Sequence, residues 1–227
     1  MPEGVNLELA HKLSERGESE KRRERWFELL EVVEVVLLAV VAIATAWSGF
    51  QATRWDGRQS LLYGQASAAR FQADAASTFG GQELLADVSI FSGWLQARSA
   101  NDAQLQALYL RRFTPDYRVA FDAWLKADPF SNPAAPAGPS LVPQYDNPYF
   151  DRAAQLNAQA TSTFDAGTAA RETADEYVRD TVLFATVLFL VAVAQRFRVR
   201  AARVAMNSIA AALLVYVLVS VSTLPRL

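Results

Sequence analysis

Acidic side chains recur at helical spacing just before the first apolar run of the chain. They are Glu24, Glu28, Glu31 and Glu34, and at roughly 100° per residue they fall within about 120° of one helix face. Acidic residues at membrane depth are costly, so they normally face a partner or water. In an oligomer, a ring of such carboxylates would favour cations at a pore mouth. One hypothesis is therefore that Glu28, Glu31 and Glu34 line the cytoplasmic mouth of a cation pore.

Arginines near two later apolar runs give the same acidic stripe a second interpretation. Arg196, Arg198, Arg200 and Arg203 fill a short segment of the chain. If this cluster lies at the same membrane depth as Glu34, the deepest acid, an ion pair forms and no carboxylate ring is left. Simple solvation of the acids at the membrane interface is a third alternative.

The remaining residue types argue against catalysis and cofactor binding. The chain has no cysteine, and its one histidine, His11, lies in a polar segment where we expect it to be solvated. There is no nucleophile paired with a histidine, no glycine-rich phosphate loop and no metal-ligand spacing. A net charge of -2 also argues against nucleic acid as a partner. We therefore predict a non-enzymatic protein without a cofactor or metal.

Three apolar runs must position these charges. They cover residues 32–50, 181–195 and 204–224, and charged residues are rare within them. A helix that spans a membrane needs roughly 17–25 mostly apolar residues. The sequence therefore predicts an all-α protein with three transmembrane helices in the lipid bilayer.

Basic residues predict the orientation of these helices. Lys21, Arg22, Arg23 and Arg25 precede the first run, and the arginine cluster lies between the second and third. The positive-inside rule keeps both groups in the cytoplasm. Segments 1–31 and 196–203 are then cytoplasmic, whereas residues 51–180 and the C-terminus lie outside. We expect a multi-pass protein of the cell membrane.

A cleaved signal peptide is the alternative for the first run, with Ala44-Thr45-Ala46 as the cleavage site. The region before this run is long for a signal peptide. It also carries Glu28, Glu31 and Glu34 beside the run, which is unusual in such peptides.

Residues 51–180 are predicted to be helical almost throughout. A first helix continues outward to about Thr78, Gly80-Gly81 form a turn, and a second helix covers 82–112. Thr114-Pro115 combines a capping residue with proline at the first helical position and starts a third helix to about Lys126. A proline-rich loop follows at 128–148.

A last helix, started by Asn147-Pro148, is predicted to run directly into the second transmembrane span. The expected result is an extracytoplasmic antiparallel helical bundle. It is thin and rich in alanine, and alanine buries little area per residue. We therefore expect several copies of the chain to associate as a homo-oligomer.

Polar and aromatic residues near the ends of the spans have expected roles as well. Trp47, Arg54 and Trp55 are predicted to anchor the first span at the membrane interface. Asn207 and Ser208, inside the third span, are expected to bond to neighbouring helices.

The stretch Trp47-Ser48-Gly49-Phe50-Gln51-Ala52, with Trp55, Gln65, Ala69 and Gln72 after it, resembles a family of uncharacterised bacterial inner-membrane proteins. The resemblance covers about the first third of the chain, and it implies a bacterial cytoplasmic membrane but no activity. The plan of membrane helix, helical bundle and membrane helix is also similar to the sensing region of chemotaxis receptors. This chain departs from those receptors because no signalling region follows its second span.

These features lead to three functional expectations. The first is a homo-oligomeric assembly that conducts cations. The second is a sensor or accessory subunit whose bundle binds a ligand or a membrane-protein partner. The third is a structural protein that organises the membrane.

Overall fold

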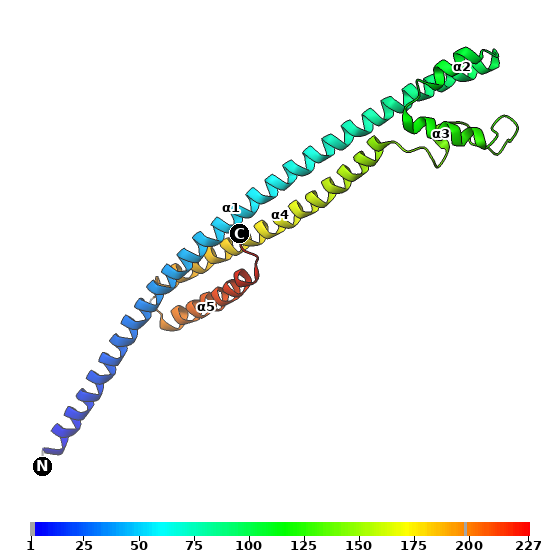
Figure 1. Cartoon of the computed structure of the whole chain (residues 1–227). Helices are drawn as coiled ribbons and strands as arrows, with labels where there is room; N and C mark the ends of the chain where they lie inside the picture. The colour runs from blue at the N-terminus through cyan, green and yellow to red at the C-terminus, as the bar shows by residue number, and fades with distance from the viewer. Residues whose placement is uncertain (1–2, 198) are drawn as a thin grey trace. The chain divides into compact units, whose positions relative to one another are not determined.

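The chain is helical wherever it has regular structure. The computed structural model describes the backbone of residues 3–197 and 199–227 (Figure 1). Side chains are described for residues 31–197 and 199–227. No strand occurs in these residues, which confirms the all-α class. The elements are α1 (Glu3–Ser99), α2 (Ala103–Leu110), α3 (Pro115–Lys126), the short 3₁₀ helix η1 (Pro139–Leu141), α4 (Pro148–Ala194) and α5 (Arg200–Thr223).

Three of these helices are long and apolar enough to cross a membrane. They are α1, α4 and α5, and each contains one of the apolar runs. The third predicted span, 204–224, matches α5 up to Thr223, and the helix begins at Arg200, so Arg200 and Arg203 lie on it. This confirms three candidate transmembrane helices, as a membrane protein would have.

The chain divides into two compact units. The membrane unit, as we call it, combines Met1–Gln59 with Thr168–Leu227, and the distal unit is Ser60–Gly167. In the membrane unit the core is formed by apolar side chains from three helices, most of them aliphatic. Its fully buried members include Val41 from α1, Phe184 and Val187 from α4, and Ala210 and Val217 from α5.

The distal unit has a core of a different kind, made mainly of aromatic rings. Phe91 and Trp94 of α1 lie against Phe121 and Trp124 of α3, with ring centroids 4.8 to 6.3 Å apart. The Nε1–H of Trp124 donates to the carbonyl of Pro136, 2.7 Å away, and so ties the proline-rich loop to this core. Edge-to-face and stacked pairs of this sort add to the stability gained by burying the rings.

The predicted turn at Gly80-Gly81 is wrong, because α1 continues through both glycines to Ser99. A Cβ atom built at Gly80 would lie 3.0 Å from the ring of Phe150 and 3.1 Å from the Cβ of Tyr149. The glycine therefore serves the close approach of α4, not a reversal of the chain. The turn comes twenty residues later, where Asn101 has a φ of 57° and Asp102 caps α2.

The predicted start signals of α3 and α4 are confirmed. The Thr114 hydroxyl accepts from the N–H of Tyr117, and Pro115 occupies the first helical position. The amide oxygen of Asn147 accepts from the N–H of Tyr149, 3.0 Å away, at the start of α4. Between Lys126 and Pro148 the only helical piece is η1, as expected for a segment rich in proline.

Two helical glycines of the distal unit allow a matched test of packing. A Cβ at Gly167 would lie 2.6 Å from the ring of Tyr63, whereas a Cβ at Gly81 would meet no atom within 4 Å. Gly81→Ala is expected to stabilise the protein by about 1 kcal/mol through helix propensity. Gly167→Ala gains the same propensity but forces the ring to move, so we expect a net loss of about 1 kcal/mol. Chemical unfolding of the two variants should give opposite signs; equal signs would contradict the packing.

Candidate functional site

A buried carboxylate of the membrane unit lies beside the first turns of α5. Glu34 of α1 is 4% exposed and accepts three hydrogen bonds from α5. The Nε of Arg203 lies 2.9 Å from one carboxylate oxygen and its Nη2 2.5 Å from the other, and Nδ2 of Asn207 lies 2.6 Å from the first. Two parallel bonds from a guanidinium fix both the position and the charge of a carboxylate. The Glu34 carboxylate is therefore neutralised and satisfied within one chain.

The other charges predicted around Glu34 are exposed or lie outside the described side chains. Glu31 is exposed, and so are Arg196 and Arg200. The side chains of Glu24, Glu28 and His11, and the whole of Arg198, lie outside the described part of the structure. Of the four arginines, Arg203 is the one whose bond to Glu34 the structure shows.

Asn207 fulfils its predicted role, since it bonds to the neighbouring helix α1 through Glu34. Its own amide oxygen is buried and has no hydrogen-bond partner in the structure. The side chain of Ser208, expected to behave in the same way, is exposed on α5.

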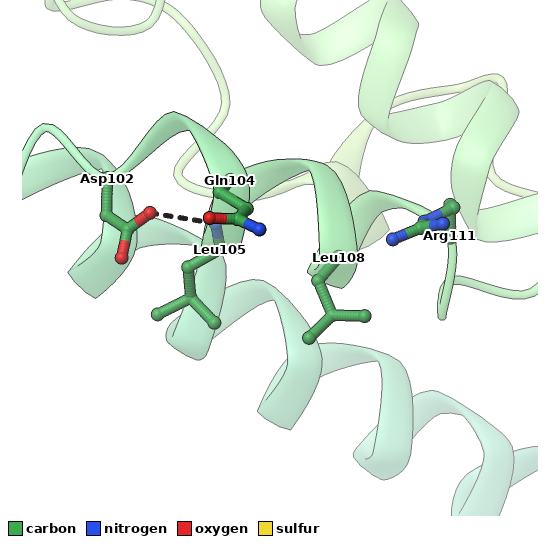
Figure 2. Close-up of a pocket in the computed structure, with 5 residues that line it drawn as sticks. All are labelled: Asp102, Gln104, Leu105, Leu108 and Arg111. Atoms are coloured by element: carbon green, nitrogen blue, oxygen red, sulfur yellow. Dashed lines mark hydrogen bonds between the residues drawn. The ribbon is translucent and has the colours of Figure 1, made fainter.

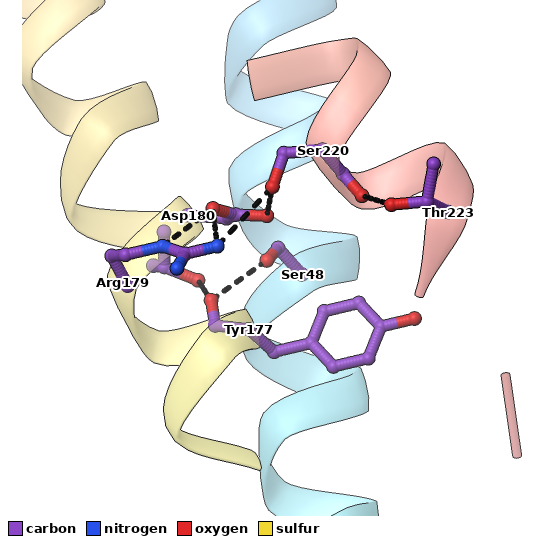
Figure 3. Close-up of polar contacts among 7 residues, drawn as sticks. Ser48, Tyr177, Arg179, Asp180, Ser220 and Thr223 are labelled. Atoms are coloured by element: carbon purple, nitrogen blue, oxygen red, sulfur yellow. Dashed lines mark hydrogen bonds and ion pairs between the residues drawn. The ribbon is translucent and has the colours of Figure 1, made fainter. Parts of the chain in front are cut away.

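A second buried carboxylate joins α4 to α5 further along the same unit (Figure 3). Asp180 is fully buried, and one of its oxygens accepts from the hydroxyl of Ser220, 2.9 Å away. The Arg179 guanidinium lies 3.3 Å from the other oxygen and 3.3 Å from the Ser220 hydroxyl. Beside this group, the Ser48 hydroxyl of α1 donates to the carbonyl of Tyr177, 3.0 Å away. Polar contacts therefore tie all three helices together at this level.

The segment after α5 is held by residues that the sequence predicted as interface anchors. The indole N–H of Trp55 and the hydroxyl of Tyr177 both donate to the carbonyl of Pro225, each at 3.1 Å. Arg54 donates to the carbonyl oxygen of Leu227 at 2.8 Å, and Arg226 lies 5.5 Å from the ring centre of Trp47. The structure thus shows Trp47, Arg54 and Trp55 in contact with residues 225–227, which follow α5.

The two buried carboxylates are separated by an apolar layer. Val41, Val187, Leu214 and Val217 are among the buried residues that fill it. The buried polar side chains described in this unit are Glu34, Ser48, Gln51 and Asp180. Ser48 is bonded to Tyr177, a member of this apolar cluster, so polar and apolar contacts together hold the three helices.

A hollow on the distal unit is a further candidate binding feature. It has a volume of about 370 Å³. It is lined by α2 residues Gln104, Leu105 and Leu108 and by the residues that flank this helix, Asp102 and Arg111 (Figure 2). The Asp102 carboxylate accepts from the N–H of Leu105, 2.9 Å away, and therefore serves as the helix cap. Leu105 and Leu108 point to the same side of α2. This is an open surface without convergent polar groups.

Sequence reasoning missed Asp180 and its partners. The signal was present, because Asp180 is the last acid before the second apolar run and Ser220 lies near the outer end of the third. The predicted orientation places both at the same membrane depth. Gln51 was also missed; it is buried, and its amide oxygen has no partner in the structure.

Comparisons with known proteins add no relative. No protein-family model, curated protein or solved structure matches the chain. Among the described residues, no group of three or more His, Cys, Asp or Glu side chains is placed to hold a metal ion.

Proposed function

We propose that this chain is a non-enzymatic accessory subunit of the cell membrane. In this proposal three helices anchor it, segments 1–31 and 196–203 face the cytoplasm, and the helical region between the first two spans forms an antiparallel bundle outside. The bundle then holds a partner protein or a second copy of the chain. Of the functions that the sequence allows, a sensor or accessory role agrees best with the contacts in the membrane unit.

The observation that carries the proposal is the pairing of Glu34. A pore of the predicted kind needs unpaired carboxylates, because only a net negative ring favours cations. Here Arg203 and Asn207 satisfy the Glu34 carboxylate. A buried ion pair between two helices fits an anchor whose helices must stay in register.

A cation channel is the second candidate, and one residue favours it. Glu31 lies one turn before Glu34 on α1 and is exposed. In an oligomer its carboxylate can still face a pore. The proposal and this alternative differ in whether the purified protein conducts ions.

Ion flux through vesicles separates the two. We expect vesicles containing the purified protein to pass potassium at the rate of empty vesicles, and Glu31→Gln to change nothing. A flux well above that background, lost in Glu31→Gln, would replace the accessory role with the channel. The partner is then sought by mild solubilisation and mass spectrometry of the intact complex, and a chain that carries no second protein and no second copy contradicts the accessory role.

A further inference from the structure

One face of α1 in the distal unit carries large apolar side chains that are mostly exposed. Leu61, Phe71 and Leu85 are 61%, 77% and 70% exposed. They belong to the helix segment that opposes α4, but they lie on the side away from it, whereas the neighbouring Phe79 is in ring contact with Tyr149 of α4. A helix face exposed to water normally carries polar and charged residues.

This face has the repeat of a coiled-coil seam. From Leu61 to Ser89 the positions follow alternating spacings of three and four residues: Leu61, Gly64, Ala68, Phe71, Ala75, Thr78, Gln82, Leu85 and Ser89. All are exposed except Ala75, which is partly buried. A seven-residue repeat of this kind keeps one stripe of a helix facing a partner helix. We call these nine positions the outer seam.

The residues that pack inward on α1 form a separate stripe. Ala66, Ala69, Ala73, Ala76 and Gly80 are buried, and Gly80 lies against Phe150 of α4. At about 100° per residue this stripe lies on the opposite side of the helix from the outer seam. The periodicity of the outer seam is therefore not a by-product of packing inside the chain.

No charge lies on the outer seam. The charged residues of α1 between positions 60 and 91 are Arg70, Asp74, Glu83 and Asp87. None belongs to the seam. The Thr78 hydroxyl donates to the carbonyl of Asp74, 2.8 Å away. Two identical seams can therefore meet without repulsion between like charges, and Gly64, Ala68 and Ala75 allow close approach of the backbones.

The area is of the right order for a pair of chains. An aromatic side chain buries roughly 150–250 Å², so Phe71 at 77% exposure offers roughly 150 Å². The two leucines bring the three to somewhat under half of the roughly 800 Å² that each partner contributes to a standard interface. The small seam residues and the flanking positions provide the remainder.

From these observations we infer that the outer seam binds the outer seam of a second copy of this chain, with the two helices parallel and in register. The parallel direction rests on the proposed function, since copies with one membrane orientation send α1 out of the membrane in the same direction. Thr78 then faces its own equivalent, as does Phe71.

Cysteine cross-linking in membranes tests this directly, because the chain has no cysteine of its own. Thr78→Cys and Ser77→Cys change adjacent exposed positions, one on the seam and one about 100° away from it. We expect oxidation to give at least about tenfold more disulfide dimer for Thr78→Cys, since a disulfide needs Cα atoms about 4.4–6.8 Å apart. Equal yields would overturn the inference. A disulfide between Leu61→Cys and Ser89→Cys copies would overturn it too, because it requires antiparallel helices.

A second measurement covers the case in which cysteines are poorly oxidised. Phe71→Glu places a charge on the seam, and Ser77→Glu places the same charge beside it. We expect native mass spectrometry to show a lower oligomer mass for Phe71→Glu only. Vesicles that conduct cations while Thr78→Cys still cross-links would refute the accessory role and leave the seam intact. Vesicles that pass no cations, combined with a Thr78→Cys variant that does not cross-link, would refute the seam alone.

Discussion

Replacing Glu34 with glutamine is expected to lower the free energy of unfolding by about 3 kcal/mol, because it leaves the Arg203 guanidinium without its counter-charge. Arg203 is largely buried, with 19% of its side chain exposed, so water replaces little of the lost interaction. The measurement is thermal or chemical unfolding of the full chain in a mild detergent, followed by helical circular dichroism.

Two further variants show whether the loss comes from the unpaired charge. Glu31→Gln makes the same change one turn earlier at an exposed position, and we expect it to alter stability by less than about 0.5 kcal/mol. The double variant Glu34→Met/Arg203→Met removes both charges and keeps the volume. It should recover most of the lost stability, because an apolar pair of similar size often replaces a buried ion pair without cost. A double variant as unstable as Glu34→Gln would show that the pair itself is stabilising.

The outcome at Glu34 also illustrates how far the sequence alone leads. Spacing along one helix placed Glu34 at the inner end of the first span, and charge counting placed four arginines at the same depth. Neither can select the partner, because that choice depends on how α5 is rotated about its axis. In the structure Arg203 and Asn207 lie one turn apart on α5 and both reach Glu34. The rotation of α5 is set by how residues such as Ala210 and Val217 pack against the other two helices. The spacing of residues along the sequence does not reveal this packing.

The helices show a similar division between local and long-range causes. The starts of α3 and α4 were predictable, since the cap and the proline act within one turn of the chain. The course of α1 through Gly80-Gly81 was not, because the reason for glycine lies in Phe150, seventy residues away. A glycine that permits close helix packing and a glycine that permits a turn look the same in a single sequence.

The distal unit contains its own buried carboxylate, and it governs where α3 begins. Asp87 of α1 is 1% exposed. One of its oxygens accepts from the N–H of Thr114 at 3.0 Å and the other from the Thr114 hydroxyl at 2.6 Å. Thr114 in turn caps α3. Burial raises the pKa of Tyr117, in the first turn of α3, and the negative charge of Asp87 raises it further.

We therefore expect Asp87→Ala to destabilise the distal unit by about 3 kcal/mol, since it leaves a buried N–H and a hydroxyl without an acceptor. Asp122→Ala is the matched control. Asp122 pairs with Arg118 at 3.3 Å on the surface, and such a pair is worth at most about 1 kcal/mol.

Hydrogen exchange of the full chain is the sharpest readout, because it reports each segment separately. Exchange should accelerate across Pro115–Lys126 in Asp87→Ala while the membrane helices keep their protection. Acceleration in α5 as well would mean that the two units unfold as one, and that Asp87 supports more than the start of α3.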